Sequence, residues 1–339
     1  GENYARLPQV TELERDALTP SGGMLIYNTT SNTVQAYNTL SWVDIVGNPI
    51  TATGYLFGGR TASTDSNNIE KWLVTTHTNQ TITTNLSVAK DGLRSMKSTT
   101  EAYIGGGNTS VDVDTIENLL FSDDTISTIT ATLTIARSQS ATVNESLKSF
   151  HAGGFGANND IDKLTHSSET ITNIAANLKF AHEQWGGYGS STDGYFAGGA
   201  TGGTAQNDVT KLVYSSETTS SLTAQLNLNH AFTNEALSTA VKGYVFGGYT
   251  GASTLQDDIE SHLFSDDTQT TLAALLSANR QGMSSMNDGT VGLVVGGQEG
   301  ADVDTIEKFT YSTEAISTES EVLTAAIRNA TGTQNTGVL

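Results

Sequence analysis

The sequence predicts an all-β protein, a six-bladed β-propeller of four-stranded blades, and three observations support this fold class. The phrase GYVFGG at residues 243–248 has five relatives, whose closing glycines together fall at 59, 107, 154, 199, 248 and 297, in steps of 48, 47, 45, 49 and 49 residues. A second signature of the type Ile-Glu-Lys follows every copy, as at residues 69–71 and 306–308. The composition, with 34 glycines and only 15% charged residues, suits short strands and tight turns.

Each repeat is predicted to contain four short strands, named a to d. A run of small residues, such as residues 281–286, forms strand a, and the glycine signature forms strand b. The Ile-Glu-Lys signature forms strand c, a polar turn such as residues 214–218 follows, and a Thr/Ile/Leu-rich run forms strand d. We expect the glycines to allow close strand packing near the propeller axis. These repeats resemble kelch-like propellers, whose period is longer than that of WD40 repeats.

The first repeat lacks a strand a, and the end of the chain has one to spare. Strands b, c and d of the first repeat begin near Gly54, with no basic residue and strand a before them. At the other terminus, residues 329–338 follow Arg328 and align with residue 281 onward, but no glycine signature comes after them. We therefore expect residues 329–338 to pair with residues 54–59 and to close the ring. Residues 49–339 would then form one propeller domain.

Residues 1–48 differ from the repeats and are predicted to form an attachment or oligomerisation segment. A charged stretch at residues 12–16 is expected to form a short helix, and residues 24–38 a β-hairpin around a Thr/Ser/Asn turn. A lone hairpin is marginal in water, so its aromatic residues should pack against something else. The residues assigned to this contact are Tyr27, Tyr37 and Trp42.

Two stretches resemble bacteriophage proteins. Residues 15–38 (RDALTPSGGMLIYNTTSNTVQAYN), with Trp42, resemble a small module of phage tail-fibre and other virion proteins. The repeats, with their IEK, YSxET and GYxFGG phrases, resemble kelch-like propellers of marine phage structural proteins. The resemblance implies a virion protein, a tail fibre or spike, that forms a homo-oligomer, by analogy a trimer, and adheres to a host-surface glycan or protein receptor or to other virion proteins. The alternative is a carbohydrate-binding propeller of a bacterial surface or a propeller enzyme.

A basic residue precedes strand a at six places and predicts a ring of basic side chains on one face of the propeller. The six positions are Lys90, Arg137, His182, His230, Arg280 and Arg328. One interpretation is a site for an anionic ligand. The other is structural, with each basic side chain paired with carbonyl groups or with the acid of the Ile-Glu-Lys signature. Because strict repetition is what a packing role produces, the structural interpretation is favoured.

Four aromatic residues on the same face are candidates for contact with a sugar ring. They are Phe155, Trp185, Tyr188 and Tyr249. They interrupt small polar segments, and aromatic faces beside Asn and Asp side chains suit a sugar ring. The alternative is that each of them packs in the core.

Charge and composition argue against several kinds of partner. The chain has 36 acidic and 16 basic residues, a net charge of −20, which disfavours a nucleic acid partner. No run approaches the ~20 apolar residues of a membrane helix, and we expect neither a membrane span nor a secretory signal.

Catalysis, cofactors and metal ions find little support either. The chain has no cysteine, and its six histidines are scattered without ligand spacing. The glycine pairs open no helix, so they do not form a phosphate-binding loop. The acidic pairs at residues 123–124, 257–258 and 266–267 are interpreted as solvated turn carboxylates rather than calcium ligands. We expect no enzyme, no cofactor and no metal site.

Overall fold

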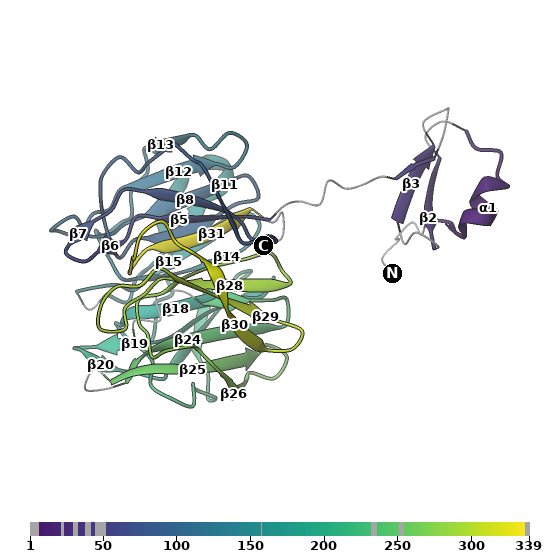
Figure 1. Cartoon of the computed structure of the whole chain (residues 1–339). Helices are drawn as coiled ribbons and strands as arrows, with labels where there is room; N and C mark the ends of the chain where they lie inside the picture. Colours follow the sequence, from purple (N-terminus) through teal and green to yellow (C-terminus); the bar gives the residue numbers. More distant parts are fainter. Residues whose placement is uncertain are drawn as a thin grey trace. The chain divides into compact units, whose positions relative to one another are not determined.

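The chain folds into two compact units of almost entirely β structure (Figure 1). A computed structural model describes residues 7–21, 24–29, 33–37, 42–44, 52–156, 158–231, 236–250 and 254–335. The contacts divide the chain into Gly1–Thr51, here the N-terminal unit, and Ala52–Leu339, here the repeat unit. Within the described residues, no helix is long and apolar enough to span a membrane.

The N-terminal unit contains one four-stranded sheet and one short helix. The sheet order is β1 (Gln9–Val10), β2 (Leu25–Asn28), β3 (Thr33–Tyr37) and β4 (Trp42–Asp44). Strands β2 and β3 form the expected hairpin, to which β1 adds in parallel and β4 antiparallel. The helix α1 (Glu12–Asp16) occupies the predicted segment and begins with a capping box, in which Thr11 and Glu14 bond each other's backbone N–H groups.

Among the described side chains of the N-terminal hairpin, one apolar and two polar ones are buried. Ile26, Asn28 and Gln35 are buried, and the Asn28 amide donates to Gln35 Oε1 at 3.1 Å. Tyr27 and Tyr37 are only half-buried within the described residues. The side chain of Trp42 lies outside the described part of the structure.

The repeat unit contains six antiparallel sheets, each built from four main strands in the order a-b-c-d. Sheet 1 is β31 (Thr331–Asn335), β5 (Thr53–Phe57), β8 (Ile69–Leu73) and β9 (Thr78–Gln80); sheet 2 is β10 (Arg94–Lys97), β11 (Glu101–Gly105), β12 (Ile116–Leu120) and β13 (Ile126–Thr128); sheet 3 is β14 (Ala141–Asn144), β15 (Lys148–Ala152), β16 (Ile161–Thr165) and β17 (Thr170–Asn173). Sheet 4 is β18 (Glu183–Gly189), β19 (Asp193–Thr201), β21 (Val209–Val213) and β22 (Thr218–Ser221); sheet 5 is β23 (Leu237–Ser238), β24 (Lys242–Thr250), β25 (Thr254–Leu263) and β26 (Thr268–Leu275); sheet 6 is β27 (Ser284–Asn287), β28 (Val291–Val295), β29 (Thr305–Thr310) and β30 (Ala315–Val322).

Three small strands and one helical turn complete the repeat unit. Strand β20 (Thr204–Ala205) pairs with β19, and β6 (Arg60–Thr61) pairs with β7 (Thr64–Asp65). A 3₁₀ helix, η1 (His166–Ser168), forms the turn between β16 and β17. The main strands of every sheet follow the predicted order a to d, with the glycine signature on strand b and the Ile-Glu-Lys signature on strand c.

Sheet 1 combines the two ends of the repeat unit. Strand β31 pairs with β5 in a register that runs from Thr331 opposite Phe57 to Asn335 opposite Thr53. This is the pairing expected for the surplus C-terminal strand; residues 336–338 of the predicted segment lie outside the described residues. The first strands of consecutive sheets also contact one another, from β10 through β14, β18, β23 and β27 to β31, and β31 contacts β10.

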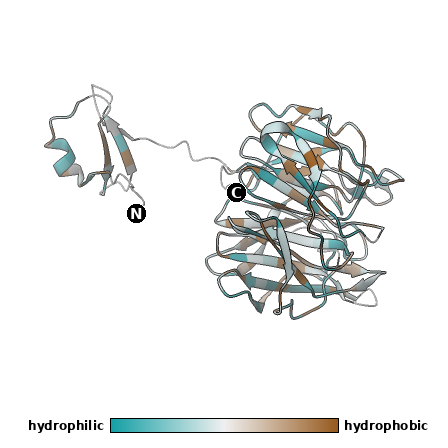
Figure 2. Cartoon of the chain, turned by 180° about the vertical axis from the view of Figure 1, so that it is seen from behind, coloured by the Kyte–Doolittle hydropathy of each residue, from teal (hydrophilic) through white to brown (hydrophobic). Residues whose placement is uncertain are grey.

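The core of the repeat unit lies between the sheets. Six apolar clusters each combine residues of two consecutive sheets, and one of them joins sheet 6 to sheet 1, with Leu56 and Trp72 packed among Met286 and Leu293. The other five boundaries are represented by Tyr55 with Ile104, Tyr103 with Leu164, Phe150 with Phe196, Tyr195 with Val245, and Phe246 with Phe309. Figure 2 shows hydrophobic residues along the strands of this unit, whereas α1 is hydrophilic. Each buried side chain of this size contributes about 1.5–3 kcal/mol, so face-to-face packing of sheets stabilises the unit.

The glycines of the signature serve two purposes. A Cβ atom on Gly243 would collide with the ring of Tyr188, and one on Gly54 would collide with Met286, so glycine here lets a neighbouring sheet approach. The closing pair, Gly247 and Gly248, has φ values of +48° and +93°, which glycine adopts without the steric cost of a side chain.

Candidate functional site

The six repeated basic residues precede the first strands of the sheets in the chain. Five of them are buried, and Arg328 is half-buried. A ring of exposed cations for an anionic ligand is therefore not present at these positions. The physical reason is that the five buried side chains are directed into the protein, where each contacts a carbonyl or carboxylate oxygen.

The acid of the Ile-Glu-Lys signature is the main partner of these cations. Arg137 contacts Asp162 at 3.4 Å and donates to the Gly153 carbonyl at 3.1 Å. Equivalent pairs are Lys90 with Glu117, His230 with Glu260, and Arg280 with Glu307. Arg328 instead pairs with Asp302 at 2.7 Å, while the signature acid Glu70 accepts a hydrogen bond from the Thr324 N–H group.

Backbone hydrogen bonds connect this arrangement to the preceding sheet. The N–H group of the second glycine of one sheet donates to the carbonyl oxygen of the basic residue that begins the next sheet. The pairs are Gly59 with Lys90, Gly107 with Arg137, Gly154 with His182, Gly199 with His230, and Gly248 with Arg280, and at the boundary of sheets 6 and 1 Gly297 donates to Ile327. We call each such junction a seam and name it after the sheet that the basic residue precedes. In sheets 2, 3, 5 and 6 the buried basic side chain also pairs with the signature acid of its own sheet, so these repeated residues help to connect the sheets.

The seam of sheet 5 contains a protonated histidine. His230 Nδ1 lies 2.7 Å from the Gly247 carbonyl, and Nε2 lies 3.0 Å from Glu260 and 3.2 Å from Asp258. Burial alone would lower the pKa of His230, but hydrogen bonds to Asp258 and Glu260 outweigh it and raise the pKa to about 9. Both ring nitrogens face oxygen acceptors, so the imidazolium takes the place of the Lys or Arg of the other seams.

The same three residues are also the one group in the described part of the chain whose spacing could hold a metal ion. Two observations favour the imidazolium: the homologous positions of sheets 2, 3 and 6 hold Lys or Arg, and Glu260 already accepts the N–H groups of Asn227 and Leu228. Asp258 was expected to be a solvated turn carboxylate, which is wrong. It lies on β25 and is buried beside His230.

The seam of sheet 4 lacks the signature acid, since Thr210 stands in its place. His182 Nδ1 lies 3.0 Å from the Gly198 carbonyl, but the nearest carboxylate, of Asp208, is 3.9 Å from Nε2. Burial lowers the pKa of His182, and Asp208 offsets this only in part. The ring stacks on Phe180 and lies tilted against Trp185, which suits a neutral imidazole.

A second set of ion pairs involves the lysine of the Ile-Glu-Lys signature and the polar turn between strands c and d. The lysine of one signature pairs with the acid in the c–d turn of the next sheet: Lys71 with Asp124 at 2.6 Å, and Lys163 with Glu217 at 2.9 Å. Both acids adopt positive φ at the turn. These pairs are partly exposed, so each contributes at most about 1 kcal/mol.

The aromatic candidates for sugar binding are mostly core residues. Trp185, Tyr188 and Tyr249 are buried, so the prediction that they present rings to a sugar is wrong for these three. Trp185 packs with Phe196 on the side of sheet 3 and Tyr188 with Tyr195 on the side of sheet 5, because the two residues lie three apart on β18 and therefore point to opposite faces of the strand. Phe155 alone is exposed, at 56%.

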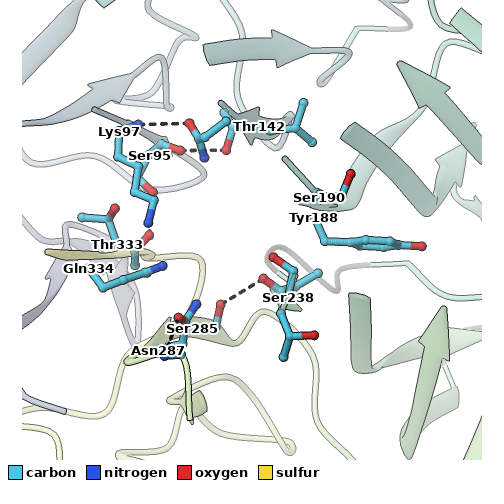
Figure 3. A pocket seen from close by; sticks show the side chains of 18 of the residues that line it. Ser95, Lys97, Thr142, Tyr188, Ser190, Ser238, Ser285, Asn287, Thr333 and Gln334 are labelled. Atoms are coloured by element: carbon cyan, nitrogen blue, oxygen red, sulfur yellow. Dashed lines mark hydrogen bonds between the residues drawn. The ribbon is translucent and has the colours of Figure 1, made fainter. Parts of the chain in front are cut away.

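The candidate site is a cavity of about 480 Å³ among the first strands of the six sheets (Figure 3). Its walls include residues of β10, β14, β18, β23, β27 and β31. The polar side chains that line it include Ser95, Thr142, Asn144, Ser238, Asn287 and Gln334. Figure 3 shows the amide of Gln334 directed into the cavity and the ring of Tyr188 directed away from it.

One lysine gives this cavity its charge. Lys97, at the end of β10, is buried, and burial lowers its pKa to about 8. Among the described lining residues the other charged group is Asp288, in the turn between β27 and β28. Turn residues such as Ser191 and Thr290 line the cavity and are exposed, so it opens at the a–b turns. Of the predicted binding residues only Tyr188 lines this cavity, with its ring directed away; for the rest of the lining the sequence signal was only a run of small polar residues in each strand a.

Comparison with known families gives one match. Residues 5–68 match the family described as "Phage tail like trimerisation region". The match covers the N-terminal unit and the beginning of sheet 1, and it supports a protein of the phage tail-fibre type. Comparison with curated proteins gives no match.

Proposed function

We propose that this chain is a structural protein of a bacteriophage virion, of the tail-fibre or spike type, and that it assembles as a homotrimer through its N-terminal region. The observation that carries the proposal is the match of residues 5–68 to a phage tail-like trimerisation region. The half-buried Tyr27 and Tyr37, with Trp42, are the residues to which we assign the intersubunit contact.

We further propose that the six sheets are the blades of a closed kelch-like propeller. Support comes from apolar clusters at all six sheet boundaries, from the glycine N–H bond at each seam, and from the pairing of β31 with β5. Such closure leaves no sheet edge between the first and last blades. An experimental structure with a gap between sheets 6 and 1 would contradict it.

In this proposal the repeat unit serves adhesion, to a host surface or to neighbouring virion proteins, and no catalysis. All six histidines have bonds that explain their burial or position, such as His77 with Glu319 and His151 with Ser140. None of them lines the cavity described above. A hydrolysis screen with polysaccharides tests this part, and any turnover above a buffer control would contradict it.

Light scattering after size-exclusion chromatography tests the trimer. The full chain should elute with three times its monomer mass of 35.6 kDa, and a Tyr27→Ser, Tyr37→Ser double variant should elute as a monomer. The matched control is Leu13→Ser, which changes an 83% exposed residue of α1 in the same unit. A monomeric full chain, or an unchanged trimer in the double variant, would overturn the assignment.

A further inference from the structure

The cavity among the six first strands is a place where polar groups from every sheet converge. Whereas each seam is built from residues of two consecutive sheets, the cavity gathers one or more residues from each of six separate strands. Its volume, about 480 Å³, lies within the range of small-molecule sites. A cavity of this size and composition can admit a ligand as large as a monosaccharide.

The lining combines groups that recognise hydroxyls with one cation. Ser95, Ser238 and Thr333 offer hydroxyl groups, and Asn287 and Gln334 offer amides, each of which both donates and accepts. Lys97 lies on β10, as Ser95 does, and its side chain extends toward Thr333 and Gln334 of the neighbouring strand β31 (Figure 3). The apolar part of the wall comes from Val143 and Ala236. Together these groups can bind a compact, hydroxyl-rich molecule that carries an anionic group.

We propose that the cavity binds a small polyhydroxylated carboxylate, of which a hexuronic acid is the simplest example. The carboxylate would lie at Lys97, and the ring hydroxyls would bond the amides and hydroxyls of the other first strands. The proposal that this binding serves attachment rests on the proposed adhesive role of the repeat unit. Binding of the ligand in the cavity does not depend on the trimer.

Two features favour a carboxylate over other ligands. A single lysine matches a single negative charge, whereas a phosphate monoester carries about two at neutral pH. The chain as a whole carries a net charge of −20, and Asp288 stands at the opening, so a multiply charged anion is repelled further. Burial lowers the pKa of Lys97 to about 8, and an anion beside it would favour the protonated form again.

Isothermal titration calorimetry of the full chain at pH 7 tests the proposal, with D-glucuronate as the probe. D-glucose is the uncharged control of nearly the same shape, and sodium phosphate tests charge without hydroxyls. A Lys97→Gln variant should bind D-glucuronate ten- to a hundred-fold more weakly, since it loses a charged hydrogen bond. It should bind D-glucose as the unaltered chain does.

Matched variants separate the site from general effects. Lys179→Gln removes an exposed lysine away from the cavity and should leave binding unchanged. A Gln334→Ala variant should weaken both sugars, because it removes a hydroxyl contact and not the charge. Thermal melting verifies that each variant is folded, and if Lys97→Gln fails to fold, Gln334→Ala carries the test.

Three outcomes would overturn the inference. They are the absence of binding heat with D-glucuronate at millimolar concentration, equal affinity of Lys97→Gln and the unaltered chain for D-glucuronate, or tighter binding of phosphate than of D-glucuronate. Comparing the affinity for a glycan that ends in glucuronate with the affinity for free D-glucuronate distinguishes a surface polymer from a free metabolite as the source of the ligand. Light scattering of the same samples reports the trimer separately, so loss of the virion assignment and loss of this site are distinguishable.

Discussion

Sheets 4 and 5 place a histidine at the same position of the same seam and give it opposite electrostatic character. His230 has Glu260 and Asp258 within 3.2 Å of Nε2, whereas His182 has Thr210 at the homologous strand position and its nearest carboxylate at 3.9 Å. In both, Nδ1 faces a glycine carbonyl. The comparison teaches that these two seams share the contact with the glycine carbonyl, and that only the seam whose strand supplies an acid holds carboxylates close to Nε2.

Copying the sheet 4 seam into sheet 5 should have the largest effect. Glu260→Thr removes the acid that neutralises His230 and that accepts the N–H groups of Asn227 and Leu228. Loss of a buried partner of this kind costs about 3–5 kcal/mol. Urea denaturation measures the loss, and Glu321→Thr, on the exposed side of β30, is the control and should change stability by less than about 0.5 kcal/mol. If the two variants lower the free energy of unfolding equally, Glu260 is not a stabilising partner of His230.

The two histidines should also give stability opposite dependences on pH. The pKa of His230 is raised to about 9 from 6.5, so its contribution is fully present below pH 6.5 and is lost as pH rises through 9. The loss amounts to about 3 kcal/mol. The pKa of His182 is lowered, so its contribution is present above pH 6.5 and is lost as pH falls below that value.

Denaturation curves between pH 5 and pH 10 measure these dependences, in the unaltered chain and in His230→Gln and His182→Gln variants. His230→Gln should abolish the fall between pH 6.5 and pH 9, and His182→Gln should leave it intact. If both variants keep that fall, the buried imidazolium is not its source.

The reverse exchange should have the smallest effect on stability while changing the sign of the pH dependence. Thr210→Glu supplies sheet 4 with the missing acid, and the pKa of His182 should rise. Because desolvation of the new pair offsets its attraction, the net change in stability at pH 6 should stay within about 1 kcal/mol. NMR titration of the ring protons measures the pKa, with Thr223→Glu, at an exposed position, as the control. An unchanged His182 pKa would show that residue 210 is not the position that sets the charge of the seam.

The sequence alone was sufficient to locate the strands of the repeat unit. The period of the glycine and Ile-Glu-Lys signatures places strands b and c, and the pairing of residues 331–335 with residues 53–57 follows from a missing first strand and a surplus last one. These features could be predicted because strand alternation, turn chemistry and repetition are local properties of the chain. The helix Glu12–Asp16 and the hairpin of the N-terminal unit were predictable for the same reason.

Which side chains face the core and which face a cavity was decided only by the tertiary structure. Trp185 and Tyr188 were taken for surface residues because their neighbours are small and polar, yet their rings enter the spaces between sheets, and Gly187 and Gly189 line the cavity. Likewise, no local pattern distinguishes Lys97 in the sequence. Only the convergence of six strands brings it together with Gln334, from the other end of the chain. Burial and charge pairing depend on residues far apart in sequence, and therefore no local pattern could decide them.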